Sequence, residues 1–172
     1  SSFQALLPQP PVTITILRDP LERILSAFNH IRRSPGHYLY EKLGGANSTL
    51  DDFVQNMSPA GYTNVHTLYL STPYLFEKSV YGAQQSLEVV EKNPNDYLSL
   101  EQAKEALEAF PFFGITEEFD ASMHLLSYTF GWEPMQSFEN KNVAKRKEQA
   151  HNPKTIDYLK EINATDYELY EF

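Results

Sequence analysis

Cysteine is absent from the sequence, and so is any long hydrophobic run. Without thiols the chain cannot form a disulfide scaffold, use a thiolate nucleophile or bind a metal through cysteine. No stretch approaches about 18 consecutive apolar residues, so no membrane-spanning helix is expected. The first residues, SSFQALLPQPP, contain no signal-peptide core. A chain without thiols is compatible with a reducing cytoplasm.

Basic residues are also scarce. The 14 lysines and arginines are outnumbered by 23 acidic residues, which gives a net charge of −9. This balance argues against a nucleic-acid-binding protein, because nucleic acids attract positively charged surfaces. Ten of the 14 bases nevertheless fall within residues 18–42 and 141–154, beside only four acids. Two basic segments in an acidic chain indicate binding of an anion, with two solvated basic faces as the alternative.

The remaining composition predicts one folded domain with an α/β fold. Of 172 residues, 41% are hydrophobic and 13% are aromatic, which is enough to form a core. Residues 10–17 (PPVTITIL) are rich in β-branched side chains and predict a strand, and residues 112–115 (FFGI) predict a second one. Both runs pass directly into helical patterns, which is typical of a parallel sheet. Because such a sheet needs more than two strands, we expect N-terminal strands to be missing from this chain.

Capping signals place the helices. Asp19 is a suitable N-cap, Pro20 suits the first helical position and Glu22 follows three residues after the cap, so a helix is expected to about Ile31. Further helices are expected over residues 47–56, 66–70, 83–92, 99–109 after the cap Ser99, 117–130 after the cap Thr116, 152–162, and from Thr165.

Arg18 stands at the end of the first strand, where open α/β sheets bind their ligands. The helix that follows offers free N–H groups and the positive end of its dipole. A guanidinium can bind a phosphate through two parallel hydrogen bonds. Ser26 lies about two turns into the helix, and its hydroxyl can reach an anion that lies beside the helix. The alternative is an ion pair between Arg18 and a carboxylate, with Ser26 at the surface.

Three segments resemble one known family. The pattern R-D-P-x-x-R-x-x-S-x-F at residues 18–28 is similar to the 3′-phosphate-binding segment of sulfotransferases that use 3′-phosphoadenosine 5′-phosphosulfate (PAPS). Residues 100–119, with LEQAK and then FGITEEF, and residues 166–172 (DYELYEF) resemble two later segments of that family, in the same order. The likeness is to carbohydrate sulfotransferases of the heparan sulfate 2-O-sulfotransferase type and their bacterial relatives.

The resemblance implies a fold, a donor and roles for particular residues. It implies that residues 1–172 form a single sulfotransferase domain with a P-loop-kinase-like parallel sheet flanked by helices. It implies PAPS as donor and PAP as product. Separately, no pair of histidines has metal-ligand spacing with nearby acids, so no metal is expected. The resemblance assigns the 3′-phosphate to Arg18 and Ser26, and a loop that closes over the nucleotide to residues 140–149, where Arg146 is the chosen candidate beside Lys145 and Lys147. A solvated loop is the alternative for that segment.

Two departures from the family pattern matter. The phosphosulfate-binding loop with its lysine, and the histidine that serves as catalytic base, are expected upstream of Pro10, so the catalytic residues are not assigned in this chain. Many relatives have N-x-Q-T-R where this chain has N-V-H-T-L at residues 64–68. His66 and Leu68 thus replace an amide and an arginine, which argues against an acceptor-contacting role at that place. His37 is a substrate-contacting candidate, with a solvent-exposed loop histidine as the alternative.

The sequence therefore predicts the PAPS-binding part of a sulfotransferase that acts on a hydroxyl of a carbohydrate or another hydroxylated acceptor. The alternatives are a catalytically inactive nucleotide- or glycan-binding module of the same fold, and an acidic interaction domain. A soluble bacterial protein of the cytoplasm is expected, with the Golgi lumen as the alternative. Neither the position sulfated nor the oligomeric state is predicted.

Overall fold

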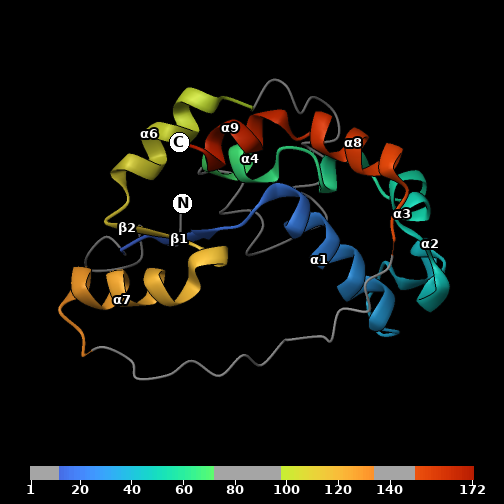
Figure 1. Ribbon diagram of the computed structural model, residues 1–172, viewed down its shortest axis with the longest axis horizontal. Coiled ribbons are helices and arrows are strands. Elements are labelled where there is room, and N and C mark those ends of the chain that lie inside the picture. Colours follow the sequence, from blue (N-terminus) through green and yellow to red (C-terminus); the bar gives the residue numbers. More distant parts are fainter. Residues whose placement is uncertain (1–11, 72–97, 134–149) are drawn as a thin grey trace, which may run out of the picture.

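The computed structural model describes residues 12–71, 98–133 and 150–172. Helices surround a small parallel sheet, in which β1 (Ile14–Leu17) pairs with β2 (Phe112–Ile115) (Figure 1). Ile14 lies opposite Phe112 and Leu17 opposite Ile115. The two strands are about a hundred residues apart in sequence, and because they run parallel the connection between them must cross over. A helix-rich α/β arrangement with parallel pairing is thus confirmed.

Eight helices and three 3₁₀ turns are described. The helices are α1 (Pro20–Arg33), α2 (Tyr40–Leu43), α3 (Leu50–Asn56), α4 (Val65–Ser71), α6 (Leu100–Ala109), α7 (Phe119–Phe130), α8 (Pro153–Glu161) and α9 (Ala164–Tyr170). The turns are η2 (Gly45–Asn47), η3 (Pro59–Gly61) and η5 (Thr116–Glu118). The expected helix at residues 83–92 lies outside the described residues.

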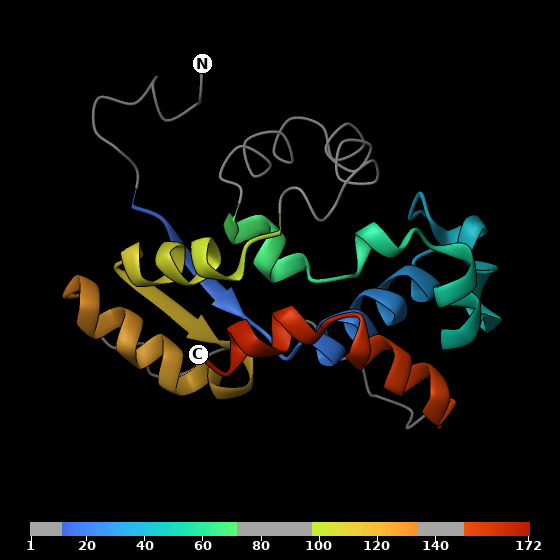
Figure 2. The same ribbon diagram turned by 90° about the horizontal axis from the view of Figure 1, so that it is seen from above.

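The sheet lies between α6 on one face and α7 on the other (Figures 1 and 2). On the α7 face, Phe112 packs with Met123 and Leu126. Gly114 permits this contact, because a Cβ added there would lie 2.9 Å from the Cβ of Ser122. On the other face, the buried side chain of Leu17 joins a core formed by Ala103, Leu107 and Leu169. Both faces of the sheet are therefore packed against helices.

A second core surrounds α1, which carries the chain away from the sheet (Figure 1). Ile24, Phe28 and Ile31 recur at helical spacing along one face of α1 and are buried. They pack with residues of α2, α3 and α8, and the ring of Phe28 meets that of Phe53 edge-on at 5.9 Å. The segment between β1 and α1 therefore lies where the two cores meet, and this places Arg18 at the end of a packed strand.

Candidate functional site

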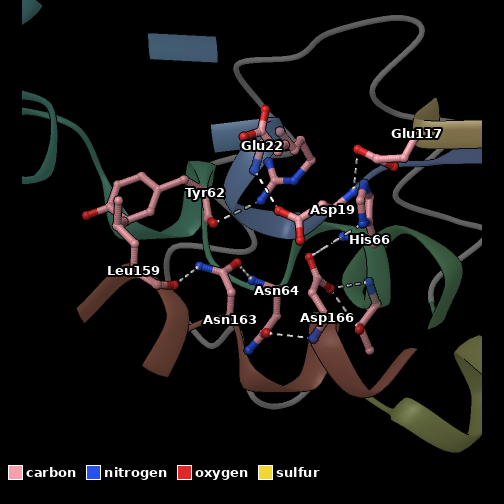
Figure 3. Close-up of polar contacts among 11 residues, drawn as sticks. Asp19, Glu22, Tyr62, Asn64, His66, Glu117, Leu159, Asn163 and Asp166 are labelled. Carbon is pink, nitrogen blue, oxygen red and sulfur yellow. Dashed lines mark hydrogen bonds and ion pairs between the residues drawn. The ribbon is translucent and has the colours of Figure 1, made fainter. Parts of the chain in front are cut away.

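The junction between β1 and α1 begins with the predicted cap. Asp19 accepts a hydrogen bond from the Glu22 amide on Oδ1 at 2.9 Å, which confirms its role as N-cap of α1. The Asp19 amide itself donates to Oε1 of Glu117 at 3.2 Å (Figure 3). The amides of Asp19 and Glu22, which the sequence suggested for an anion, are thus directed at carboxylates of the protein.

Arg18 lies between two carboxylates at this junction. Its Nη2 is 3.6 Å from Oε2 of Glu22, and its Nε is 3.9 Å from Oε1 of Glu117. Both distances exceed that of a good charge-assisted hydrogen bond. The Nε atom is buried without a hydrogen-bond partner, while 28% of the side chain remains exposed. The structure therefore shows the ion-pair alternative for Arg18, in a loose form.

Ser26 and Arg146 complete the predicted donor contacts. Ser26 is exposed on α1 and follows Glu22 by one helical turn, so these two side chains lie on the same side of the helix. Arg18 precedes the helix and lies 3.6 Å from Glu22. Arg146, together with Lys145 and Lys147, lies outside the described residues. The assignment of these residues to a nucleotide stays a prediction.

A buried polar cluster beside the junction was not predicted from the sequence. We call it the α4–α9 cap and define it by Asn64, Thr67, Asn163 and Asp166. The Asp166 carboxylate is fully buried and accepts hydrogen bonds from the amides of His66 and Thr67, at 3.0 and 2.8 Å. The Thr67 hydroxyl donates to the same carboxylate at 2.8 Å. A carboxylate from α9 therefore caps the start of α4 (Figure 3).

The capping is mutual. Asn64 precedes α4, and its Oδ1 accepts the Asp166 amide of α9 at 3.1 Å. The Asn64 amide donates to Oδ1 of Asn163 at 2.8 Å, and Asn163 in turn donates to the Leu159 carbonyl at 2.8 Å. Asn64 adopts a positive φ of 45°, a conformation that asparagine tolerates better than most residues. Asp166 of α9 thus caps the start of α4, and Asn64, just before α4, caps the start of α9.

Arg23 and His66 connect the cap electrostatically to the junction. Arg23 donates to the Tyr62 carbonyl at 3.0 Å; burial lowers the pKa of Arg23, and the charge of Asp166 partly offsets this. Burial likewise lowers the pKa of His66, against opposing effects of Asp166 and Glu117. His66 Nδ1 lies 3.9 Å from Oδ2 of Asp166. His66 therefore favours its neutral form between the two carboxylates.

An open hollow of about 470 Å³ adjoins the junction and is lined by Asp19, Leu21, Glu22, Lys160 and Tyr167. It offers carboxylates, an ammonium and a phenol, which are groups that hydrogen-bond polar ligands. Within the described ranges, no three His, Asp or Glu side chains are grouped to hold a metal.

The chain belongs to the sulfotransferase family, whose sequence profile matches residues 9–172. Among its curated relatives is heparan-sulfate 6-O-sulfotransferase 2 of Danio rerio, 28% identical over 179 residues that cover 92% of this chain and 36% of the relative. Heparan-sulfate 6-O-sulfotransferase 1 of Cricetulus griseus and of Mus musculus are each 26% identical over 177 residues, covering 92% of this chain and 42% and 41% of the relatives. The chain thus spans about two fifths of the length of these relatives.

These relatives confirm the predicted family of carbohydrate sulfotransferases. Their names specify the 6-O position, whereas the motifs were compared with the 2-O type. The expectation of a bacterial cytoplasmic protein is wrong, because the relatives are heparan-sulfate sulfotransferases of animals. Among the described helices, none is long and apolar enough to cross a membrane.

Proposed function

We propose that this chain supplies the donor-binding part of a sulfotransferase that moves a sulfuryl group from PAPS to a carbohydrate hydroxyl. The observation that carries the proposal is the position of Arg18. It follows a strand of a parallel sheet, directly before a well-capped helix, in a chain of the sulfotransferase family. Ligands of α/β sheets bind at this end of the strands. The names of the relatives support a sulfated polysaccharide as acceptor.

Arg18 and Ser26 would hold the 3′-phosphate of the donor from the exposed side of α1. The guanidinium supplies charge and two parallel donors, and the hydroxyl supplies one more. Because the amides of Asp19 and Glu22 are directed at Glu117 and Asp19, the side chains carry most of this contact. In the proposed P-loop-kinase-like sheet, the sulfated end of the donor would lie beyond the carboxyl ends of the strands.

In the proposed reaction, the acceptor oxygen attacks sulfur while the bond between sulfur and the bridging oxygen of the 5′-phosphate breaks. PAP leaves with the electron pair of that bond, and the hydroxyl proton passes to a base. The lysine and histidine expected upstream of Pro10 would stabilise the leaving oxygen and accept the proton. Residues of this chain then act by orienting the donor, with Arg146 as the proposed contact from the later basic segment.

Calorimetric titration of the full chain with PAP tests the site. We expect Arg18→Ala to weaken PAP binding by about 2–4 kcal/mol, because a charge-assisted phosphate contact is lost. Arg33→Ala is the matched control, since Arg33 is exposed at the far end of the same helix. Equal affinity in both variants would remove Arg18 from the site.

A radiolabelled PAPS assay with desulfated heparan sulfate tests the reaction separately. Transfer of label to the polysaccharide supports the sulfotransferase. Binding of PAP without transfer, by a protein that also carries the expected upstream lysine and histidine, would instead indicate a nucleotide-binding module that has lost the reaction.

A further inference from the structure

Glu117 engages Arg18, which the proposed function gives to the donor phosphate, and it also accepts the Asp19 amide beside it. We propose that Glu117 is an internal counter-anion of the donor site: its carboxylate engages Arg18 and the Asp19 amide until a phosphate displaces it, and it thereby lowers the affinity of the site. This inference rests on the proposed function. It assigns Glu117 as a residue that sets donor affinity, from a segment that β2 delivers to the end of β1.

The geometry of one carboxylate oxygen carries the inference. Oε1 of Glu117 accepts the Asp19 amide at 3.2 Å and lies 3.9 Å from Nε of Arg18. An amide before a helix and a guanidinium are the donors that proteins use for phosphate oxygens. Glu117 Oε1 therefore stands where a phosphate oxygen would bind, and the two cannot occupy that place together.

The other carboxylate oxygen is held from the end of α9. Tyr170 donates its hydroxyl to Oε2 of Glu117 at 3.0 Å. Burial, followed by this hydrogen bond and the charge of Glu117, raises the pKa of Tyr170 to about 12. The phenol therefore stays protonated and remains a donor at ordinary pH. Tyr170 thus favours the position of Glu117 that blocks the junction.

The contacts of Glu117 with Arg18 and with the Asp19 amide are weak enough for a phosphate to replace them. Its side chain is 35% exposed, and that of Arg18 is 28% exposed. Ion pairs at such exposed positions contribute little net stability. Glu117 lies in η5, between β2 and α7, and its side chain can rotate without movement of either element. A phosphate that approaches Arg18 also meets the charges of Asp19 and Glu22, so removal of one carboxylate lessens the repulsion.

Calorimetric titration of the full chain with PAP tests this inference. Glu117→Gln keeps the size of the side chain and removes its charge, so we expect PAP to bind about fivefold more tightly. Tyr170→Phe releases the carboxylate from its tether, and we expect a gain of about twofold. Glu118→Gln is the matched control, because it makes the same charge change at the next exposed position. We expect it to leave PAP affinity nearly unchanged.

The outcomes separate the inference from the proposed function. Tighter binding by Glu117→Gln, beyond any change in Glu118→Gln, supports the counter-anion. Equal or weaker binding by Glu117→Gln, when the unmodified chain binds PAP, overturns the inference and leaves the proposed function intact. Failure of the unmodified chain to bind PAP overturns the proposed function. If thermal melting shows that Glu117→Gln does not fold, Tyr170→Phe decides by the same criteria.

Discussion

Asp166 and Glu117 both accept backbone N–H groups at helix starts, but they differ in how deeply they are buried. Asp166 is fully buried and receives three hydrogen bonds of 3.0 Å or less, from His66 and Thr67. Glu117 is partly exposed and receives the Asp19 amide at 3.2 Å. A satisfied, buried carboxylate is costly to remove, whereas a loosely held one can exchange for a ligand. Burial thus separates the structural anion from the displaceable one.

The largest effect is expected from removal of the buried carboxylate. Asp166→Ala leaves the α4 amides and the Thr67 hydroxyl without an acceptor, and it leaves the Arg23 charge less compensated. We expect the free energy of unfolding to fall by about 3–5 kcal/mol in urea denaturation. Asp157→Ala, at an exposed position of α8, is the control and should change it by less than about 0.5 kcal/mol. Similar losses in both variants would show that the α4–α9 cap adds no stability.

A smaller effect is expected from the partner residue of the same cap. Asn64→Ala loses the acceptor for the Asp166 amide and replaces asparagine by a residue that tolerates this positive φ less well, so we expect a loss of about 2 kcal/mol. Asn64→Gly also loses the acceptor but accepts this φ, so we expect about 1 kcal/mol less destabilisation. Chemical denaturation of both variants measures how much of the lost stability comes from the positive φ at residue 64. If Asn64→Gly is no more stable than Asn64→Ala, the positive φ does not contribute.

The smallest effect is expected from His66 and depends on pH. Because burial lowers the pKa of His66 in the folded chain, the unfolded chain binds the proton more readily. Stability is therefore highest above the unfolded pKa of about 6.5 and falls as the pH drops below it. In urea denaturation at pH 7.5 and pH 5.5, His66→Gln should lose less stability than the unmodified chain. Burial, and then the charge of Arg32, lowers the pKa of His151 as well, so part of the dependence of stability on pH remains in the His66→Gln variant. Equal slopes in both chains would contradict this role.

Local signals predicted the elements that position the site. Asp19 caps α1 and Ser99 caps α6 by accepting the amide three residues later, as their spacing predicted. The strand at residues 112–115 and the end of α7 at the left-handed Gly131 were also predicted correctly. Caps, prolines and glycines act within one turn of chain, so the sequence expresses them directly.

A contact between distant segments changed one local prediction. Thr116 was expected to cap the helix that follows it, but its hydroxyl donates to the Leu17 carbonyl at 2.9 Å and the chain first forms η5. The pairing of β1 with β2 brings these residues together, and no spacing reveals it. The helix α2 was not predicted because it has four residues and no side-chain cap.

The candidate site was predictable only in part. The motif identified Arg18 and Ser26, but it could not show that Glu117, 99 residues later, lies against Arg18. Nor could the motifs at residues 64–68 and 166–172 show that Asn64 and Asp166 cap each other's helices. Such partners are set by the packing of α4 and α9 against the sheet, which periodicity along a single segment does not express.

The residues of α9 stabilise two different parts of the structure. A chain cut after Leu169 would lose the phenol that holds Glu117 yet retain the buried start of α4. A chain cut after Thr165 would lose Asp166 as well, together with the Leu169 side chain that fills the core beneath β1. Under the proposed function, stepwise removal of residues from Phe172 backwards would therefore alter nucleotide affinity first and destabilise the fold second.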